Sequence, residues 1–178
     1  TVENVENFDI QSNNSPSRFD TSNVTGTNNF RIFNSSTRVT IDEQPEQTAL
    51  TIDNATGQND VGLFYGFPVN DPFFNQFTQQ VNIVNSDIDF LRLGGNQPNG
   101  TDVAAGIGAV SIDVDNGNGA TPNIINGIIS DDVEEITVTG DGDITFMDVT
   151  PTADMMAAAP LGTGASGKTA DTLTYDGS

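Results

Sequence analysis

The sequence has no cysteine, no histidine and no tryptophan, and its single lysine is Lys168. Disulfides, iron–sulfur clusters and thiolate zinc sites are therefore excluded. The absent side chains also exclude catalysis by a histidine base or a cysteine nucleophile. No apolar run of about 18 residues is present, so we expect no membrane-spanning helix.

Basic side chains are also scarce. Five Lys and Arg residues face 25 Asp and Glu residues, which gives a net charge of −20, and 19 of the acids are Asp. Such self-repulsion loosens a compact chain in dilute buffer, whereas molar salt shortens the Debye length to about 3 Å and screens it. The composition is that of a protein from a very salty environment. Nucleic acid as a direct partner is disfavoured, because phosphate binding needs Lys and Arg.

Short runs of alternating polar and apolar residues recur between clusters of Asn, Asp, Gly and Pro. This pattern is typical of antiparallel sheets. The sequence thus predicts an all-β fold, an antiparallel jelly-roll sandwich or barrel with at most one or two short helices. The residues expected on inward faces are Phe30, Ile32, Val39, Ile41, Leu50, Ile52, Leu63, Tyr65, Val81, Ile83, Val110, Ile112 and Val114. We expect one domain over 1–178, with extended polar arms at about 1–29 and 161–178.

The segment 134–149, "EEITVTGDGDITFMDV", predicts a hairpin. A three-residue loop, 140–142, pairs Val138 with Ile144 and keeps both apolar sets on one face, with a glycine at positive φ. Two other stretches, 150–160 and 70–80, carry weak helix signals. No internal repeat is evident.

The stretch "GTGASGKT", 162–169, matches the phosphate-loop pattern letter for letter. A working phosphate loop follows a buried strand and opens a long helix. Here the preceding residues predict a helix ended by Pro160, and only nine residues follow Thr169. We therefore expect a terminal loop and no bound nucleotide.

Clustered carboxylates are the remaining candidate site. If a Ca²⁺, Mg²⁺ or Na⁺ ion binds, the expected ligands are Asp113, Asp115, Asp141 and Asp143, although Asp and Gly also form ordinary solvated turns. No twelve-residue calcium loop is present. The acidic pairs, such as Asp87 and Asp89, give no sign of a shared catalytic pocket, so we expect no enzyme, no catalytic residue and no other cofactor. Five glycosylation sequons begin at Asn13, Asn23, Asn34, Asn54 and Asn99.

Strand runs such as "FRIFNSSTRVTID", "GAVSIDVDN" and "EEITVTGDGDITFMDV", in an acidic cysteine-free chain of this length, resemble the small single-jelly-roll major capsid proteins of tailless icosahedral haloarchaeal viruses with an internal membrane. The resemblance implies a capsid shell subunit that assembles with copies of itself and a larger partner capsid protein, above a membrane, with the virion as its location. The resemblance assigns no site residue to this chain.

Besides a calcium-binding adhesion module, two alternatives remain open on the sequence. One is an exported haloarchaeal surface or pilus-like subunit, which polymerises by donating the strand "VENFDIQ" (5–11) to a neighbour. The other is a decoration or spike protein of a virion.

Overall fold

The computed structural model describes residues 1–57, 59–66, 77–95, 107–117, 123–129, 135–146 and 172–175. These residues form three sheets and no helix, which confirms the all-β class. The seven-stranded sheet contains, in spatial order, β15 (Thr172–Tyr175), β13 (Glu135–Thr139), β11 (Ile107–Asp115), β9 (Phe77–Val84), β7 (Ala49–Asp53), β5 (Asn29–Phe33) and β2 (Asn7–Ile10). The six-stranded sheet contains β14 (Ile144–Phe146), β12 (Asn123–Ile129), β10 (Asp87–Gly95), β8 (Asn59–Tyr65), β6 (Val39–Gln44) and β3 (Ser17–Asp20). A short pair joins β1 (Val2–Glu3) to β4 (Val24–Thr25).

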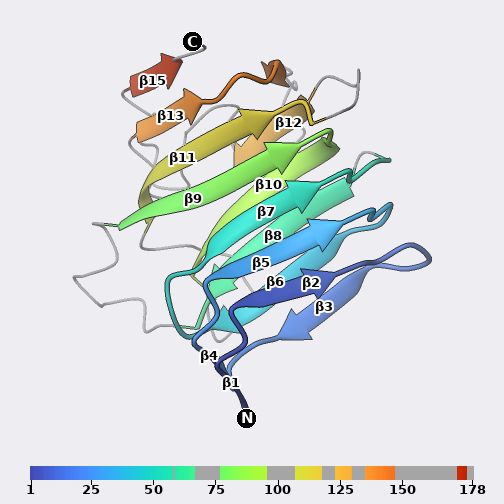
Figure 1. The fold of residues 1–178 in the computed structure, drawn as a ribbon, viewed down its shortest axis with the longest axis vertical. Helices are drawn as coiled ribbons and strands as arrows, with labels where there is room; N and C mark the ends of the chain where they lie inside the picture. The colour runs from blue at the N-terminus through green and yellow to red at the C-terminus, as the bar shows by residue number, and fades with distance from the viewer. Residues whose placement is uncertain are drawn as a thin grey trace, which may run out of the picture.

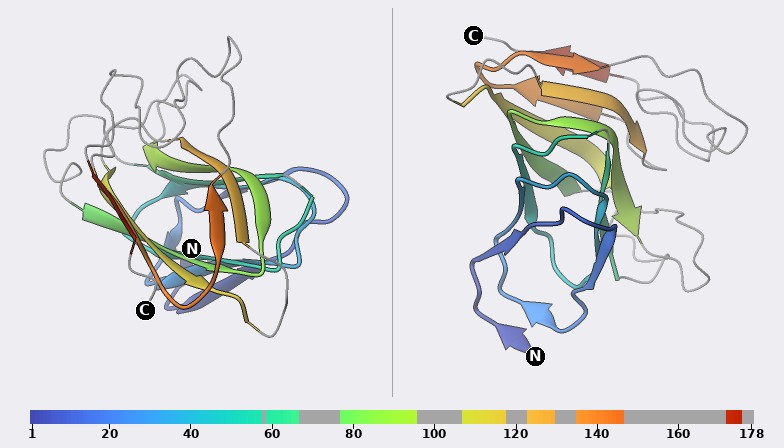
Figure 2. Two further views of the ribbon diagram at one scale, coloured as in Figure 1. Left: turned by 90° about the horizontal axis from the view of Figure 1, so that it is seen from above. Right: turned by 90° about the vertical axis from the view of Figure 1, so that its right-hand side faces the viewer.

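The chain visits the two large sheets in turn, so that β2 leads to β3, β5 to β6, and β7 to β8 (Figure 1). Every described strand pair is parallel, including the central pairs of both large sheets. Each coil therefore adds one strand to each sheet, and the coils stack into a solenoid (Figure 2). The predicted antiparallel jelly roll is wrong, because every strand pairs with strands of the neighbouring coils rather than with the next strand of the chain.

The core lies between the two large sheets, where side chains of one coil stack on those of the next. Ile32 aligns with Ile52 in the seven-stranded sheet, and Ile41 aligns with Leu63 in the six-stranded sheet. All four side chains have no exposed surface. The inward residues predicted from alternation are all buried, and Ile136 and Val138 are buried with them.

The coils differ in length, which is why the sequence shows no regular repeat. Residues one coil apart are separated by 20 positions at Asn34 and Asn54, by 22 at Arg38 and Asp60, by 31 at Thr51 and Asn82, and by 37 at Asp89 and Asn126. The long connections follow strands of the six-stranded sheet, between β8 and β9, β10 and β11, and β14 and β15.

Asparagines form the tight corner by which the chain passes from the seven-stranded to the six-stranded sheet. Asn34, Asn54 and Asn85 have φ of 47°, 53° and 46° and occupy equivalent places in successive coils. The amide of Asn54 donates from Nδ2 to Oδ1 of Asn34 at 2.5 Å. Asn tolerates this left-handed conformation better than other residues with a side chain. We call these three residues the asparagine corner.

The expected hairpin at 134–149 does not form. β13 pairs with β11, and β14 pairs with β12 in the other sheet, so Val138 lies beside Ile112 rather than Ile144. The loop does contain a glycine at positive φ, because Gly140 has φ of 103°. It turns the chain from one sheet to the other instead of back along the same sheet.

The expected N-terminal arm, 1–29, contributes β1 to β4 and the first residue of β5. At 70–80, where a turn or short helix was expected, residues from Phe77 onward belong to β9. The predicted helix at 150–160 and the phosphate-loop match at 162–169 lie outside the described residues. Of the C-terminal arm, 161–178, only β15 is described.

A candidate anion-binding site

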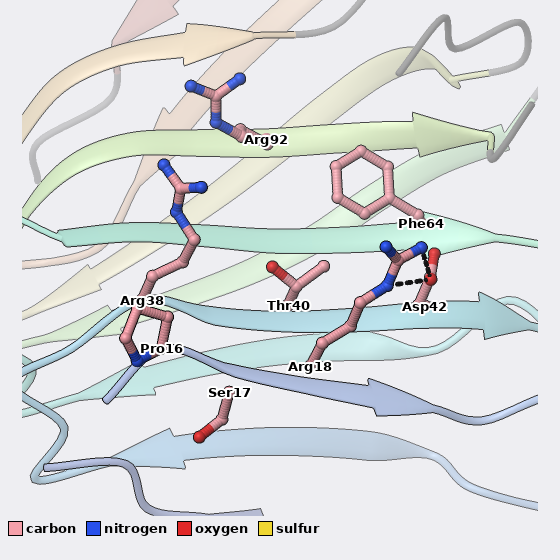
Figure 3. A pocket seen from close by; sticks show the side chains of 8 residues that line it. All are labelled: Pro16, Ser17, Arg18, Arg38, Thr40, Asp42, Phe64 and Arg92. Carbon is pink, nitrogen blue, oxygen red and sulfur yellow. Dashed lines mark hydrogen bonds and ion pairs between the residues drawn. The ribbon is translucent and has the colours of Figure 1, made fainter. Parts of the chain in front are cut away.

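The outer face of the six-stranded sheet carries a cavity of about 350 Å³ (Figure 3). Three of the four arginines of the chain, Arg18, Arg38 and Arg92, line it. Thr40, Asp42 and Phe64 line it as well. We call this cavity, with these six residues, the arginine pocket.

The strand register produces the hollow. Arg18 on β3, Thr40 on β6, Gly62 on β8 and Arg92 on β10 occupy one row across the sheet. The two middle positions carry a small side chain and none, so no long side chain of this row stands between the two arginines. A Cβ at Gly62 would lie 2.7 Å from Cε2 of Phe64, which shows that the phenylalanine ring lies over this glycine.

A buried carboxylate, Asp60, holds two of the guanidinium groups. Its Oδ2 accepts a hydrogen bond from Nη2 of Arg38 at 2.6 Å and from Nε of Arg92 at 2.9 Å. The Asp60 side chain is 8% exposed, whereas those of Arg38 and Arg92 are 54% and 30% exposed. One negative charge thus faces two positive charges, and the guanidinium groups reach the solvent.

The third arginine of the pocket, Arg18, forms a salt bridge with a different carboxylate. Arg18 donates from Nε and Nη2 to Oδ2 of Asp42, whose side chain is 6% exposed. Asp20 lies close enough to Arg18 to interact with it electrostatically, and Asp89 lies close to Asp60, so carboxylates balance the guanidinium charges around the pocket. Three of the four arginines nevertheless gather here, in a chain whose net charge is −20.

The fourth arginine, Arg31, lies on the other large sheet. It donates from Nη2 to Oδ2 of Asp53 at 2.5 Å and from Nη1 to Oδ2 of Asp9 at 3.4 Å. Two carboxylates therefore surround this one guanidinium. Arg31 serves below as the matched control for the pocket arginines.

A β-bulge in β10 continues this surface toward the C-terminal coils. The register with β8 shifts between Ile88 and Leu91, so both of these side chains point into the core, although three positions separate them. Asp89 and Phe90, which lie between them, are only half-buried. The guanidinium carbon of Arg92 lies 5.6 Å from the centre of the Phe90 ring, and that ring lies 3.1 Å from the place of a Cβ on Gly127.

Asp89 has a raised pKa. Burial is the largest cause, and the nearby carboxylates of Asp60 and Asp87 add to it, although a hydrogen bond of 2.6 Å from Nδ2 of Asn126 lowers the pKa. The folded state therefore disfavours the ionised form of Asp89.

Replacing Asp89 by Asn is therefore expected to stabilise the fold at neutral pH, because the change removes the charge and retains an acceptor for Asn126. The gain is present above the raised pKa and disappears below about 3.8, the ordinary value, where the carboxyl is protonated in both states. Denaturant unfolding of both proteins at several pH values in molar salt measures it. If the gain in stability persists in acid, the raised pKa of Asp89 is contradicted.

The arrangement is suited to holding an anion. Guanidinium groups present several N–H donors in a planar fork, which matches the oxygens of carboxylates, sulfates and phosphates. Among the described residues, Arg92 donates a hydrogen bond through Nε to Asp60, and its side chain is 30% exposed.

The four aspartates expected to hold a cation lie on two segments, 113–115 and 141–143, that are neighbours in the structure. Thr139 Oγ1 lies 3.5 Å from Oδ1 of Asp113, and the backbone N–H of Gly142 donates to the carbonyl of Val114. Asp115 Oδ1 accepts from the backbone of Gly117 at 2.6 Å. Among the described residues, no group of three or more His, Cys, Asp or Glu side chains is placed to hold a metal ion. A cation at Asp113, Asp115, Asp141 and Asp143 stays a prediction.

Two of the five sequons have a structural explanation, because Asn34 and Asn54 belong to the asparagine corner. Asn13 and Asn23 are exposed, and Asn99 lies outside the described residues.

The sequence analysis missed the arginine pocket. The available signal was the equal spacing of 22 positions that separates Arg38 from Asp60 and recurs between Asp9 and Arg31. This spacing becomes meaningful only when the coil is recognised as the repeating unit.

Comparison with protein-family models, curated proteins and solved structures gave no match to this chain. In the described part of the chain, no helix has the length and apolar character needed to cross a membrane. The function is therefore inferred from the residues of the site.

Proposed function

We propose that this chain is a salt-adapted, non-enzymatic surface module of a virion or cell envelope that binds an anionic ligand in the arginine pocket. The observation that carries the proposal is the gathering of three of the four arginines around one cavity, in a chain with a net charge of −20. Buried Asp42 and Asp60 hold the guanidinium groups in place, which lowers the entropy lost on binding.

The expected role of capsid shell subunit rested on the resemblance to jelly-roll proteins. Parallel sheets remove the architectural support for that role, and for the larger capsid partner and the internal membrane that came with it. The role of virion decoration or spike protein does not depend on a jelly roll. A stacked solenoid suits that role, because its outer faces are continuous surfaces on which a site can be displayed.

The pilus-like alternative required the segment 5–11 to be given to a neighbour. In the structure, β2 within this segment already pairs with β5, and Ile10 is buried in the chain's own core. An exported surface protein remains within the proposal, without strand donation.

Titration with glucuronate tests the proposal, and glucose serves as the neutral control. We expect the Nε–Hε NMR signals of Arg38 and Arg92 to shift with glucuronate in molar salt, while that of Arg31 stays in place. Arg38→Gln is expected to weaken binding about tenfold or more, because a hydrogen bond to a charged group is lost. Arg31→Gln is the matched control and should bind normally. Equal shifts at all four arginines, or shifts at none, would contradict the proposal.

A further inference from the structure

We infer that the ligand of the arginine pocket is a linear acidic polysaccharide that lies along the solenoid axis, across β3, β6, β8, β10 and β12. The inference rests on the proposed function and adds the class and direction of the ligand. Its first support is the length of the site. Arg18 and Arg92 lie in one row three strands apart, which places their backbones about 14 Å from each other. A ligand of one sugar unit covers only part of this row.

The second support is a pair of aromatic rings that lie against glycines on the same face. The Phe64 ring lies over Gly62 within the pocket, and the Phe90 ring lies against Gly127 beyond it. Because glycine has no side chain, each ring packs down on the backbone. Phe64 is buried, with 6% of its surface exposed, and the half-buried Phe90 keeps part of its surface at the solvent. Arg92 lines the pocket and also lies over Phe90, so it connects the two parts.

The third support is the mixture of donors and acceptors along this strip. Half-buried Asp89 accepts hydrogen bonds, and the guanidinium groups of Arg38 and Arg92, which reach the solvent, donate them. Sugar hydroxyls can use both kinds of group, while a sparse acidic group on the polymer meets the arginines. A nucleic acid carries a charge on every unit, and a chain of net charge −20 with so few basic residues repels it.

The test compares one sugar acid with oligosaccharides of the same sugar, up to a length that covers five strands about 4.8 Å apart. Calorimetry in molar salt measures binding of polyuronate, sulfated polysaccharide, neutral polysaccharide and single-stranded DNA. We expect affinity to rise with length for the acidic sugars, and the tighter of the two acidic series identifies the acidic group as carboxylate or sulfate. Equal binding of the neutral polymer, or tighter binding of DNA, overturns the inference.

Phe90→Leu separates the extended site from the pocket. This variant keeps an apolar side chain against Gly127 and removes the ring beneath Arg92, so we expect long oligosaccharides to bind about threefold more weakly and the single sugar acid to bind normally. Thermal unfolding confirms that the variant is folded, and Arg31→Gln is the control for a change at a distant surface.

The two proposals fail in different ways. If the single sugar acid binds and longer chains bind no more tightly, the inference of a polysaccharide ligand is overturned and the proposed anion site stands. If no acidic sugar of any length binds, both are overturned.

Discussion

Transfer of the protein from about 1 M to about 0.1 M salt is expected to unfold it, because the Debye length grows from about 3 Å to about 10 Å. The net charge of −20 then acts between coils that the fold holds one strand spacing apart. Burial is the main cause of the raised pKa of Asp89, and the nearby carboxylates of Asp60 and Asp87 raise this pKa further, as expected for like charges on one face. The expected result is a loss of the β-sheet circular dichroism signal and a larger hydrodynamic radius on gel filtration.

A variant distinguishes charge screening from binding of a particular cation. In this variant Asp113, Asp115, Asp141 and Asp143 are all replaced by Asn, which removes four exposed charges at one end of the solenoid. We expect it to remain folded at lower salt than the wild-type protein. If Ca²⁺ raises the melting temperature of the wild type more than Na⁺ at equal ionic strength, and does not do so for the variant, these aspartates hold a cation. A wild-type chain that stays folded without salt contradicts the salt adaptation.

The sequence predicted which side chains are buried, but it could not give the direction of the strands. Val110, Ile112 and Val114 are buried and Asp113 and Asp115 are exposed, as alternation requires. Alternation reports only that one face of a sheet is covered. Parallel sheets usually have both faces covered and therefore lack alternation. Here each large sheet covers the other on one side only, so parallel strands carry the pattern expected of antiparallel ones.

The segment 87–93 shows where the strict period of two fails. Ile88, Leu91 and Leu93 all point inward, because the bulge adds one residue between the first two. From the sequence, this segment had apolar residues on both faces. The bulge also turns Phe90 outward beneath Arg92, so one irregular residue changes both the core and the candidate site.

The arginine pocket could not be predicted for a related reason. Arg18 and Arg92 lie in one row only because the coils between them bring β3, β6, β8 and β10 into register. The first two of these coils span 22 positions each, from Arg18 to Thr40 and from Thr40 to Gly62. The third spans 30 positions, from Gly62 to Arg92, because it contains the long connection between β8 and β9. The composition shows that arginine is scarce, but only the strand register shows where the arginines gather.

The substitution Gly140→Ala is expected to lower the free energy of unfolding by about 3 kcal/mol or more. Gly140 has φ of 103°, where a side chain alone costs about 1–2 kcal/mol. An added Cβ would also lie 2.2 Å from the carbonyl oxygen of Val114 and 2.7 Å from its nitrogen, so the backbone of β11 or β13 must move. That movement breaks the register on which the stacking of Ile112 and Val138 depends.

Gly57→Ala is the matched control, because it isolates the effect of conformation. Gly57 has φ of 94°, yet an added Cβ there would meet only the amide nitrogen of the Asn59 side chain at 3.1 Å and a carbonyl oxygen at 3.4 Å. We expect a loss of about 1 kcal/mol from the left-handed backbone alone. Denaturant unfolding in molar salt measures both losses.

Hydrogen exchange then shows how far the damage spreads. In the described part of the chain, each strand pairs only with strands of neighbouring coils, so Gly140→Ala should expose the amides of β11 and β13 and leave those of β5 and β6 protected. The arginine pocket, built on β3 to β10, should then keep its affinity for acidic sugars. Similar losses of stability in the two variants would show that the close approach of Gly140 to Val114 is not what holds this corner. Loss of protection across all coils would show that the solenoid unfolds as one unit instead of coil by coil.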